Sequence, residues 1–248
     1  MKLARITSGT GKSISFLHGF TQTKESWAPV VEQLPLGHQY TIIDAPGHGQ
    51  SLDGKRNLVE AANDVAETMS QGILVGYSMG ARIALHTALQ HPETVSALVL
   101  ISGTAGIDDD NERKQRRDSD EALSNRISEV GVPAFITEWL SNPMFSGLSS
   151  ALADVPSRCQ NTAAGLGDSL RFAGTGTQTP LWNVLHTLAM PVLLIAGAND
   201  QKFVDLARRM KSLIPQSELH VIDDVGHTCH LENITRFTAI FQDWLSRI

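Results

Sequence analysis

The sequence predicts an α/β fold with a mostly parallel central sheet and a helical cap insertion. Six short apolar runs recur, each followed by turn-forming residues: Ile14–Leu17, Tyr40–Ile43, Ile73–Val75, Ala97–Ile101, Val192–Ile195 and Leu219–Ile222. Such runs are typical of strands that are covered on both faces, as in a parallel sheet. The stretches between them have helical spacing, as in Ala81–Gln90. Alternation of strand and helix indicates an α/β fold.

The strand pattern stops between about residues 105 and 187. This stretch contains a loop rich in glycine and threonine at 174–177, and three other pieces look helical: Asn111–Glu129, Val132–Leu140 and Leu148–Ala164. An insertion at this point lies over the carboxyl edge of the sheet, where such folds bind their ligands. We therefore expect a core at 1–104 and 188–248 and a helical cap at 105–187.

Composition excludes several classes of protein. The chain has 248 residues, and its 20 Lys and Arg against 26 Asp and Glu give a net charge of −6, which argues against a nucleic-acid partner. Cys159 and Cys229 are too few for a disulfide framework. The first residues lack the apolar segment of a signal peptide, and no run reaches the roughly 18 apolar residues of a membrane span. We expect a soluble cytoplasmic protein with no membrane partner.

The segment Gly76–Gly80 reads Gly-Tyr-Ser-Met-Gly and lies between an apolar run and a predicted helix. It matches G-x-S-x-G, in which a serine on a sharp strand-to-helix turn exposes its hydroxyl. The pattern alone is common by chance, and its strand–turn–helix context is what predicts a nucleophile. Ser78 is the candidate, and a plain glycine-rich turn is the alternative interpretation.

A serine hydroxyl needs an adjacent base at neutral pH. His227 follows the last apolar run and is the candidate base, with His230 as the alternative. Asp200 follows Val192–Ile195 and is the candidate acid that orients the imidazole. The order nucleophile, acid and histidine along the chain is a known arrangement of such triads.

An oxyanion hole needs backbone N–H groups aimed at developing negative charge. We expect one from Met79, directly after the nucleophile, and one from Phe20 in the His-Gly-Phe turn after the first core strand. No His or Cys cluster has the spacing of metal ligands, and a triad needs neither a metal nor a cofactor.

Taken together, these motifs resemble the α/β-hydrolase superfamily across nearly the whole chain. Further segments are similar to one family within it, the 2-succinyl-6-hydroxy-2,4-cyclohexadiene-1-carboxylate synthases of menaquinone biosynthesis. These segments are Leu17–Thr21, Gly76–Arg82, Glu112–Arg117, Trp139 with Asn142–Phe145, Arg158 with Asn161, Gly174–Gln178 with Leu181 and Trp182, and Asp200–Phe203. Ala81, where the family usually has glycine, and Thr228–His230 depart from its pattern.

Arg82 lies four residues after Ser78, one turn further along the same face of the predicted helix. A guanidinium there costs desolvation energy unless it meets an anion, and it can hold a carboxylate by two parallel hydrogen bonds. An esterase for neutral esters has no need of such a group. The alternative is an ion pair with a carboxylate of the protein.

The resemblance also implies substrate arginines in the cap, at Arg116 and Arg158. Arg116 shares a helix face with Arg113 and Arg117, and charge runs are commonly solvated faces, so a surface role stays open. The remaining candidates for substrate binding are Tyr77, Trp139, Phe145 and Lys202. Tyr77 could donate a hydrogen bond, the two aromatic cap residues could form pocket wall or cap core, and the lysine could add positive potential.

The resemblance implies a carbon–oxygen lyase that acts on a small polycarboxylate. It would eliminate pyruvate from 2-succinyl-5-enolpyruvyl-6-hydroxy-3-cyclohexene-1-carboxylate, in a pathway to menaquinone or to phylloquinone. Ser78, deprotonated by His227, would take a ring proton while the oxyanion hole holds the enolate. The alternative is a carboxylesterase or a carbon–carbon bond hydrolase with the same triad, and a binding protein on the same scaffold comes third.

Overall fold

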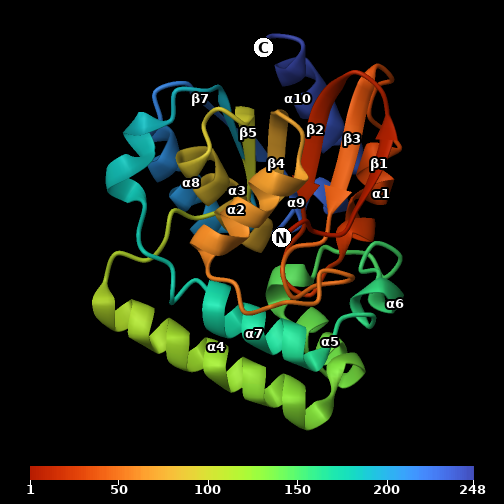
Figure 1. Ribbon diagram of the computed structural model, residues 1–248, viewed down its shortest axis with the longest axis vertical. Helices are drawn as coiled ribbons and strands as arrows, with labels where there is room; N and C mark the ends of the chain where they lie inside the picture. The colour runs from red at the N-terminus through yellow and green to blue at the C-terminus, as the bar shows by residue number, and fades with distance from the viewer.

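The computed structural model describes all 248 residues and has a seven-stranded sheet at its centre (Figure 1). The strands are β1 (Arg5–Gly9), β2 (Lys12–Leu17), β3 (His38–Ile43), β4 (Gly72–Tyr77), β5 (Val95–Ile101), β6 (Val192–Gly197) and β7 (Ser217–Ile222). Their order in the sheet is β1-β3-β2-β4-β5-β6-β7, and only β1 with β3 is antiparallel. The predicted α/β class and mostly parallel sheet are confirmed.

Both faces of the sheet are covered, which explains why the predicted strands are apolar throughout. In β5, Leu98 and Leu100 belong to one buried cluster, while Val99 and Ile101 belong to the cluster on the other face. The apolar pattern does not predict β1, because all five of its residues are exposed and it pairs only at the edge.

Helices pack on each face of the sheet (Figure 1). They are α2 (Leu58–Thr68), α3 (Met79–Gln90) and α8 (Gln201–Leu213) on one face, and α1 (Ala28–Val31), α9 (Cys229–Glu232) and α10 (Ile234–Leu245) on the other. Val65, Ile83 and Val204 lie in the first buried cluster, and Phe237 lies in the second. No helix of the structure has the length and apolar character needed to cross a membrane.

The residues between β5 and β6 form a helical layer below the sheet in Figure 1. Its helices are α4 (Asp110–Val130), α5 (Val132–Leu140), α6 (Val155–Arg158) and α7 (Ala163–Ala173), with 3₁₀ helices at Pro143–Phe145 and Trp182–Thr187. A further 3₁₀ helix, Lys24–Trp27, follows β2. The layer has a small core of its own, which includes Ile127, Phe135 and Leu166. The cap at 105–187 remains a proposal.

The predicted helix over Leu148–Ala164 is wrong. Only the four residues of α6 are helical within its interior, and the longer helix α7 begins at Ala163. Asp154 has a φ of 48°, in the left-handed region, and therefore interrupts any helix that would cross it. Thr162 accepts a hydrogen bond from the Gly165 backbone N–H and begins α7 as its N-cap.

The loops at the carboxyl ends of β2 and β3 are joined by a buried ion pair. Lys24 Nζ lies 2.9 Å from Asp44 Oδ2, and the two side chains are 5% and 0% exposed. The Asp44 carboxylate also accepts hydrogen bonds from the backbone N–H groups of Lys24 (2.8 Å) and Gln50 (3.0 Å). This carboxylate therefore fixes both loops at the edge of the sheet that carries the candidate site.

We predict that Asp44→Ala lowers the free energy of unfolding by about 3–5 kcal/mol, because it leaves a buried ammonium with a half-exposed Glu25 as its only carboxylate partner. Urea unfolding followed by circular dichroism measures this. Asp205→Ala removes an exposed carboxylate that pairs with Arg208, and it should change stability by less than about 1 kcal/mol. Equal effects of the two substitutions would contradict the role given to Asp44.

Candidate active site

Ser78 stands on a strained turn between β4 and α3. Its φ of 52° and ψ of −106° are conformations that residues other than glycine rarely adopt. The turn requires the glycines on both sides, since a Cβ on Gly76 would overlap the Gly80 carbonyl and a Cβ on Gly80 would overlap the Leu17 carbonyl. The G-x-S-x-G segment thus has the geometry of a nucleophile elbow, with the hydroxyl facing a pocket.

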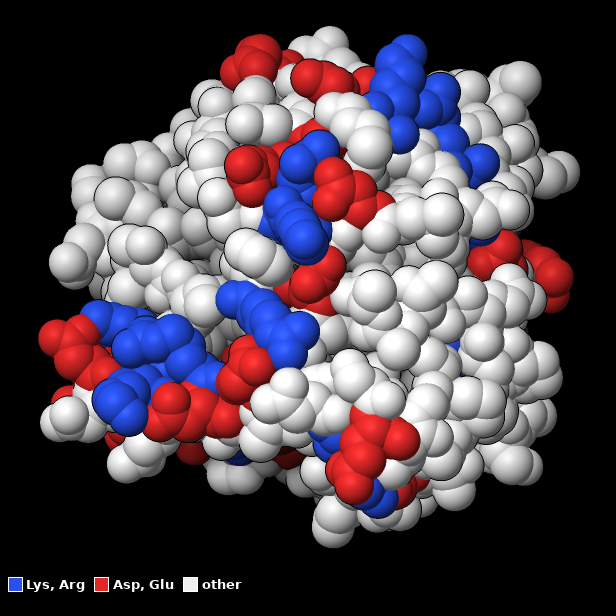
Figure 2. Space-filling model, turned by 60° about the horizontal axis from the view of Figure 1, so that its bottom comes forward, with Lys and Arg blue, Asp and Glu red and all other residues white.

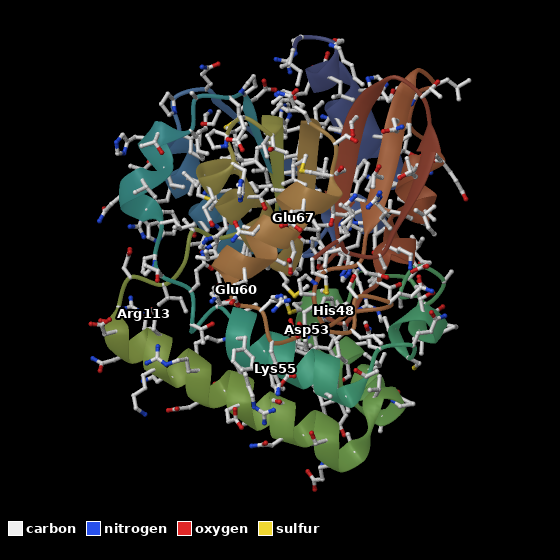
Figure 3. The ribbon with its side chains drawn as sticks, in the orientation of Figure 1. His48, Asp53, Lys55, Glu60, Glu67 and Arg113 are labelled. Atoms are coloured by element: carbon white, nitrogen blue, oxygen red, sulfur yellow. The ribbon has the colours of Figure 1, made fainter.

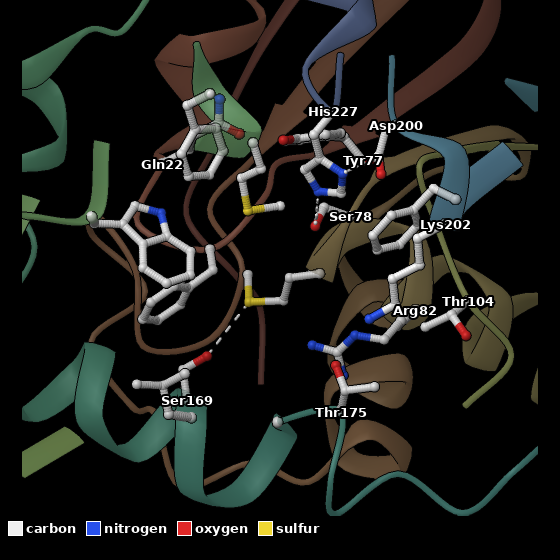
Figure 4. A pocket seen from close by; sticks show the side chains of 18 of the residues that line it. Gln22, Tyr77, Ser78, Arg82, Thr104, Ser169, Thr175, Asp200, Lys202 and His227 are labelled. Carbon is white, nitrogen blue, oxygen red and sulfur yellow. Dashed lines mark hydrogen bonds and ion pairs between the residues drawn. The ribbon is translucent and has the colours of Figure 1, made fainter. Parts of the chain in front are cut away.

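A chain of hydrogen bonds connects Ser78, His227 and Asp200 (Figure 4). His227 Nδ1 lies 2.6 Å from Asp200 Oδ2, and His227 Nε2 lies 3.0 Å from Ser78 Oγ. With the Nδ1–H donating to the carboxylate, Nε2 is left to accept the serine proton. The Phe203 ring packs against the imidazole with centroids 4.5 Å apart. The arrangement is suited to drawing a proton from the hydroxyl.

His230, the alternative base, occupies a different environment. Its ring lies between Trp27 and Tyr77, with centroids 4.7 Å and 4.3 Å away, and it makes no hydrogen bond to Ser78. Burial lowers the pKa of His230 to about 3, so the ring stays neutral at physiological pH. The geometry favours His227 as the base.

The backbone N–H of Phe20 is held in a defined orientation by its own peptide unit. The Gly19 carbonyl accepts hydrogen bonds from Gln22 N–H (3.1 Å) and from His18 Nδ1 (2.8 Å). His18 Nε2 accepts from Ala45 N–H at 3.0 Å, which places the ring proton on Nδ1. Because a trans peptide is planar, fixing this carbonyl directs the Phe20 N–H the opposite way.

The two candidate oxyanion donors are unpaired. No acceptor within the protein meets the Phe20 N–H. Met79 is the first residue of α3, where the N–H groups of a helix have no partner in the helix itself. Both residues line the pocket that contains the Ser78 hydroxyl. The arrangement can stabilise an oxyanion that forms near Ser78.

Arg82 and Arg158 are buried at this pocket without a carboxylate partner. Arg82 is 7% exposed, and its Nη1 donates to the Ala173 carbonyl at 2.7 Å. Arg158 is 2% exposed and donates from Nε to the Ala153 carbonyl at 2.6 Å and from Nη1 to Thr21 Oγ1. Burial lowers the pKa of each to about 10, so both keep their charge at neutral pH. The ion pair considered as the alternative for Arg82 does not form.

Among the cap arginines of α4, only Arg116 lines the pocket. Its Nε donates to Asp120 at 2.8 Å, and its side chain is partly exposed. Arg113 pairs with Asp110 at the start of α4, at the outer end of the cap (Figure 3). Arg117 donates to the Gly176 carbonyl at 2.9 Å. The three arginines therefore differ in environment: Arg116 lines the pocket, and Arg113 and Arg117 do not.

Aromatic residues of the cap form both pocket wall and cap core. Trp139 packs against Phe20 and Phe145, with ring centroids 5.2 Å and 5.8 Å apart, and it also stacks on Phe135. The Tyr77 hydroxyl makes no hydrogen bond within the protein, and burial raises its pKa well above the usual value. Lys202 lines the pocket beside Phe203.

His48 is the remaining histidine near the site, and it is structural. Its ring lies between the sheet and the cap (Figure 3), where it packs against His18 and Phe20 with centroids 5.1 Å and 5.8 Å away. Its Nδ1 lies 3.0 Å from the Pro46 carbonyl, and burial lowers its pKa to about 3.

The candidate residues from the sequence line one cavity of about 370 Å³, and the alternative base His230 does not (Figure 4). The cavity is also lined by residues that the sequence analysis did not single out: Gln22, Thr104, Met144, Ser169, Leu170, Gly174, Thr175 and Phe203. Several of these fall inside the segments that resemble the synthase family. The other four lie outside those segments, and no pattern in the sequence singles them out: Gln22, Thr104, Ser169 and Leu170. No group of three or more His, Cys, Asp or Glu side chains is arranged to hold a metal ion.

Residues 12–234 match a family model described as the alpha/beta hydrolase fold. The chain is 36% identical to a protein of Bacillus subtilis (strain 168) that carries the name 2-succinyl-6-hydroxy-2,4-cyclohexadiene-1-carboxylate synthase provisionally, over 96% of this chain and 91% of that protein. It is 33% identical to the synthase of the same name from Enterobacter sp. (strain 638), over 88% and 85% of the two chains. The chain belongs to this synthase family of α/β-hydrolases.

A solved structure agrees with this assignment. The structure described as MenH from S. aureus superposes on this α/β-hydrolase with a TM-score of 0.91 at 28% identity, and the match covers 100% of this chain and 99% of that chain. The resemblance and the α/β-hydrolase fold predicted from the sequence are therefore confirmed.

We predict that a fluorophosphonate probe, which reacts with activated serines, labels this synthase-family member at Ser78. Asp200→Asn should slow labelling by about 10³-fold or more, because the imidazole then adopts the wrong tautomer. Mass spectrometry of the labelled peptide over time measures the rate. Asp205→Asn, on the exposed side of α8, is the matched control, and labelling of Asp200→Asn at the wild-type rate would exclude a working triad.

Proposed function

We propose that this chain is a lyase that eliminates pyruvate from 2-succinyl-5-enolpyruvyl-6-hydroxy-3-cyclohexene-1-carboxylate. The product is 2-succinyl-6-hydroxy-2,4-cyclohexadiene-1-carboxylate, the compound in the names of its relatives. The observation that carries the proposal is the pair of buried guanidinium groups, Arg82 and Arg158, in the pocket of Ser78. The substrate has three carboxylates and can pair with both.

The first step is removal of a proton from the ring carbon that bears the succinyl group. This proton is acidic because it is adjacent to the ketone of that group. His227 takes the Ser78 hydroxyl proton while the serine oxygen takes the ring proton, and Asp200 stabilises the imidazolium. The electron pair of the C–H bond moves to the ketone oxygen, where the N–H groups of Phe20 and Met79 stabilise the enolate.

The second step expels the leaving group. The enolate returns its electrons to the ring, the ring double bond shifts by one position, and the bond from carbon 5 to the enolpyruvyl oxygen breaks. The ring then holds two conjugated double bonds, and the released enolpyruvate takes up a proton and becomes pyruvate. That proton comes from the His227 imidazolium, so His227 is again neutral, while Ser78 keeps the former ring proton as its hydroxyl hydrogen. No acyl-enzyme forms, although the catalytic groups are those of a hydrolase.

Electrostatics supports the lyase over the esterase. Both reactions can use the same triad and oxyanion donors, so these groups do not distinguish them. A neutral ester leaves two buried guanidinium groups without an anion, whereas a polycarboxylate compensates their desolvation. Arg116 and Lys202 add positive charge to the same cavity.

We predict that Arg82→Ala lowers kcat/KM for pyruvate elimination by about 30-fold to 5,000-fold, which corresponds to roughly 2–5 kcal/mol for a desolvated charge pair. Hydrolysis of small neutral esters such as p-nitrophenyl acetate should change little. Pyruvate release is measured by coupling to NADH oxidation through lactate dehydrogenase.

Arg236→Ala is the matched control for the loss of one positive charge, because Arg236 is exposed and forms no ion pair. It should leave both activities at their wild-type values. Equal losses on both substrates in Arg82→Ala would show that Arg82 stabilises the cap and does not select the substrate.

A further inference from the structure

The loop that carries His227 is held by Glu232, a residue of α9 that does not line the main pocket. Glu232 Oε2 accepts a hydrogen bond from Gly226 N–H at 2.7 Å. Its Oε1 accepts from Thr228 N–H at 3.0 Å and from Thr228 Oγ1 at 2.6 Å. The donors are the residues on either side of His227, so one carboxylate holds both flanks of the histidine.

These bonds replace the regular backbone pairing that the loop lacks. The loop lies between β7 and α9, outside any helix or strand, so its backbone N–H groups need other acceptors. Hydrogen bonds to a carboxylate are stronger than those between neutral groups. Ser102 adds one further bond, from its Oγ to the His227 carbonyl at 2.8 Å. The backbone at His227 is thereby fixed while its ring reaches Asp200 and Ser78 together.

The cap contacts the same carboxylate. Gly147, two residues after the pocket residue Phe145, lies so close to Glu232 that a Cβ at this position would overlap Oε2. Gly147 and Glu232 border a second cavity of about 190 Å³, which His227 and Asp200 also line. The absence of a side chain at Gly147 lets this cap segment approach without displacing Glu232.

We propose that Glu232 is a positioning residue that holds His227 in reach of Asp200 and Ser78. Gly147 provides the space that this arrangement needs. Glu232 acts through the loop backbone and does not touch the substrate. This inference rests on the proposed role of His227 as the base.

The test uses Glu232→Gln in the full-length protein. Glutamine keeps one acceptor oxygen but places an NH₂ donor against a backbone donor, so at least one of the three bonds is lost. We expect the rate of fluorophosphonate labelling at Ser78 and the kcat of pyruvate elimination each to fall by about 10²-fold, with KM little changed. The reason is that a displaced base slows the chemical step. Thr228→Val, which removes one donor and leaves the carboxylate, should cause a smaller loss of the same kind.

Gly147→Ala supplies an independent test from the cap side. Its methyl group should displace Glu232 and lower the labelling rate of Ser78. The double variant with Glu232→Gln should label no more slowly than the slower of the two single variants, because both substitutions act through one contact. Asp243→Asn, an exposed carboxylate on α10, is the control and should label at the wild-type rate. Melting curves establish that each variant is folded.

The inference would be overturned if folded Glu232→Gln labelled at the wild-type rate, or if only its KM changed. Additive effects of Gly147→Ala and Glu232→Gln would also contradict it. The labelling rate does not depend on the identity of the substrate. A wild-type protein that labels at Ser78 but releases no pyruvate would therefore contradict the proposed function while still testing Glu232.

Discussion

The buried guanidinium groups of Arg82 and Arg158 are the constraint on which the arrangement of this molecule depends. Removing a charge from water costs several kcal/mol unless other groups compensate it. Part of the compensation is structural, because the cap carbonyl of Ala173 accepts from Arg82 of the core, and Arg158 of the cap donates to Thr21 of the core. The charges that face the cavity thus also join cap to core.

Asn161 strengthens this connection. Its Nδ2 donates to the Thr21 carbonyl at 2.8 Å, and its Oδ1 accepts from Gly49 N–H at 2.8 Å. Thr21 follows the candidate oxyanion donor Phe20, and Gly49 lies in the loop that His48 orders. The cap is therefore hydrogen-bonded to two loops that shape the site, so a change at the cap surface of the pocket can alter the geometry next to the reacting atoms.

The charge of the pocket is opposite to that of the molecule. The net charge is −6, and acidic and basic side chains alternate over the cap face in Figure 2. In the cap helices α4 and α7, Lys114 pairs with Asp118, and Arg171 pairs with Glu121, both at 2.8 Å. These exposed pairs contribute little free energy. Arg82 and Arg158 of the pocket, in contrast, are buried, and charge interactions are stronger for buried groups than at the surface.

Local patterns in the sequence account for most of the core and for the three residues of the candidate triad. The apolar runs and the G-x-S-x-G segment are patterns of residues close in sequence, so six of the seven strands could be predicted from them. The same kind of pattern singled out Ser78, Asp200 and His227, which the structure connects by hydrogen bonds. Contacts that depend on packing between segments far apart in the sequence could not be predicted in this way. Ser169 reaches the pocket only because α7 packs over Met79. In the sequence, nothing distinguishes Glu232, which accepts a hydrogen bond from Gly226, from an ordinary surface acid. The error at Leu148–Ala164 has a similar origin, since helical composition does not reveal the left-handed backbone at Asp154.

The most direct test of the account is a comparison of two ligands by isothermal titration calorimetry. The proposed product, 2-succinyl-6-hydroxy-2,4-cyclohexadiene-1-carboxylate, and its dimethyl ester differ in negative charge and little in shape near the ring. If the buried arginines exist to hold carboxylates, the free acid should bind at least about 100-fold more tightly, or roughly 2.7 kcal/mol. Equal affinity for the acid and the ester would contradict the account.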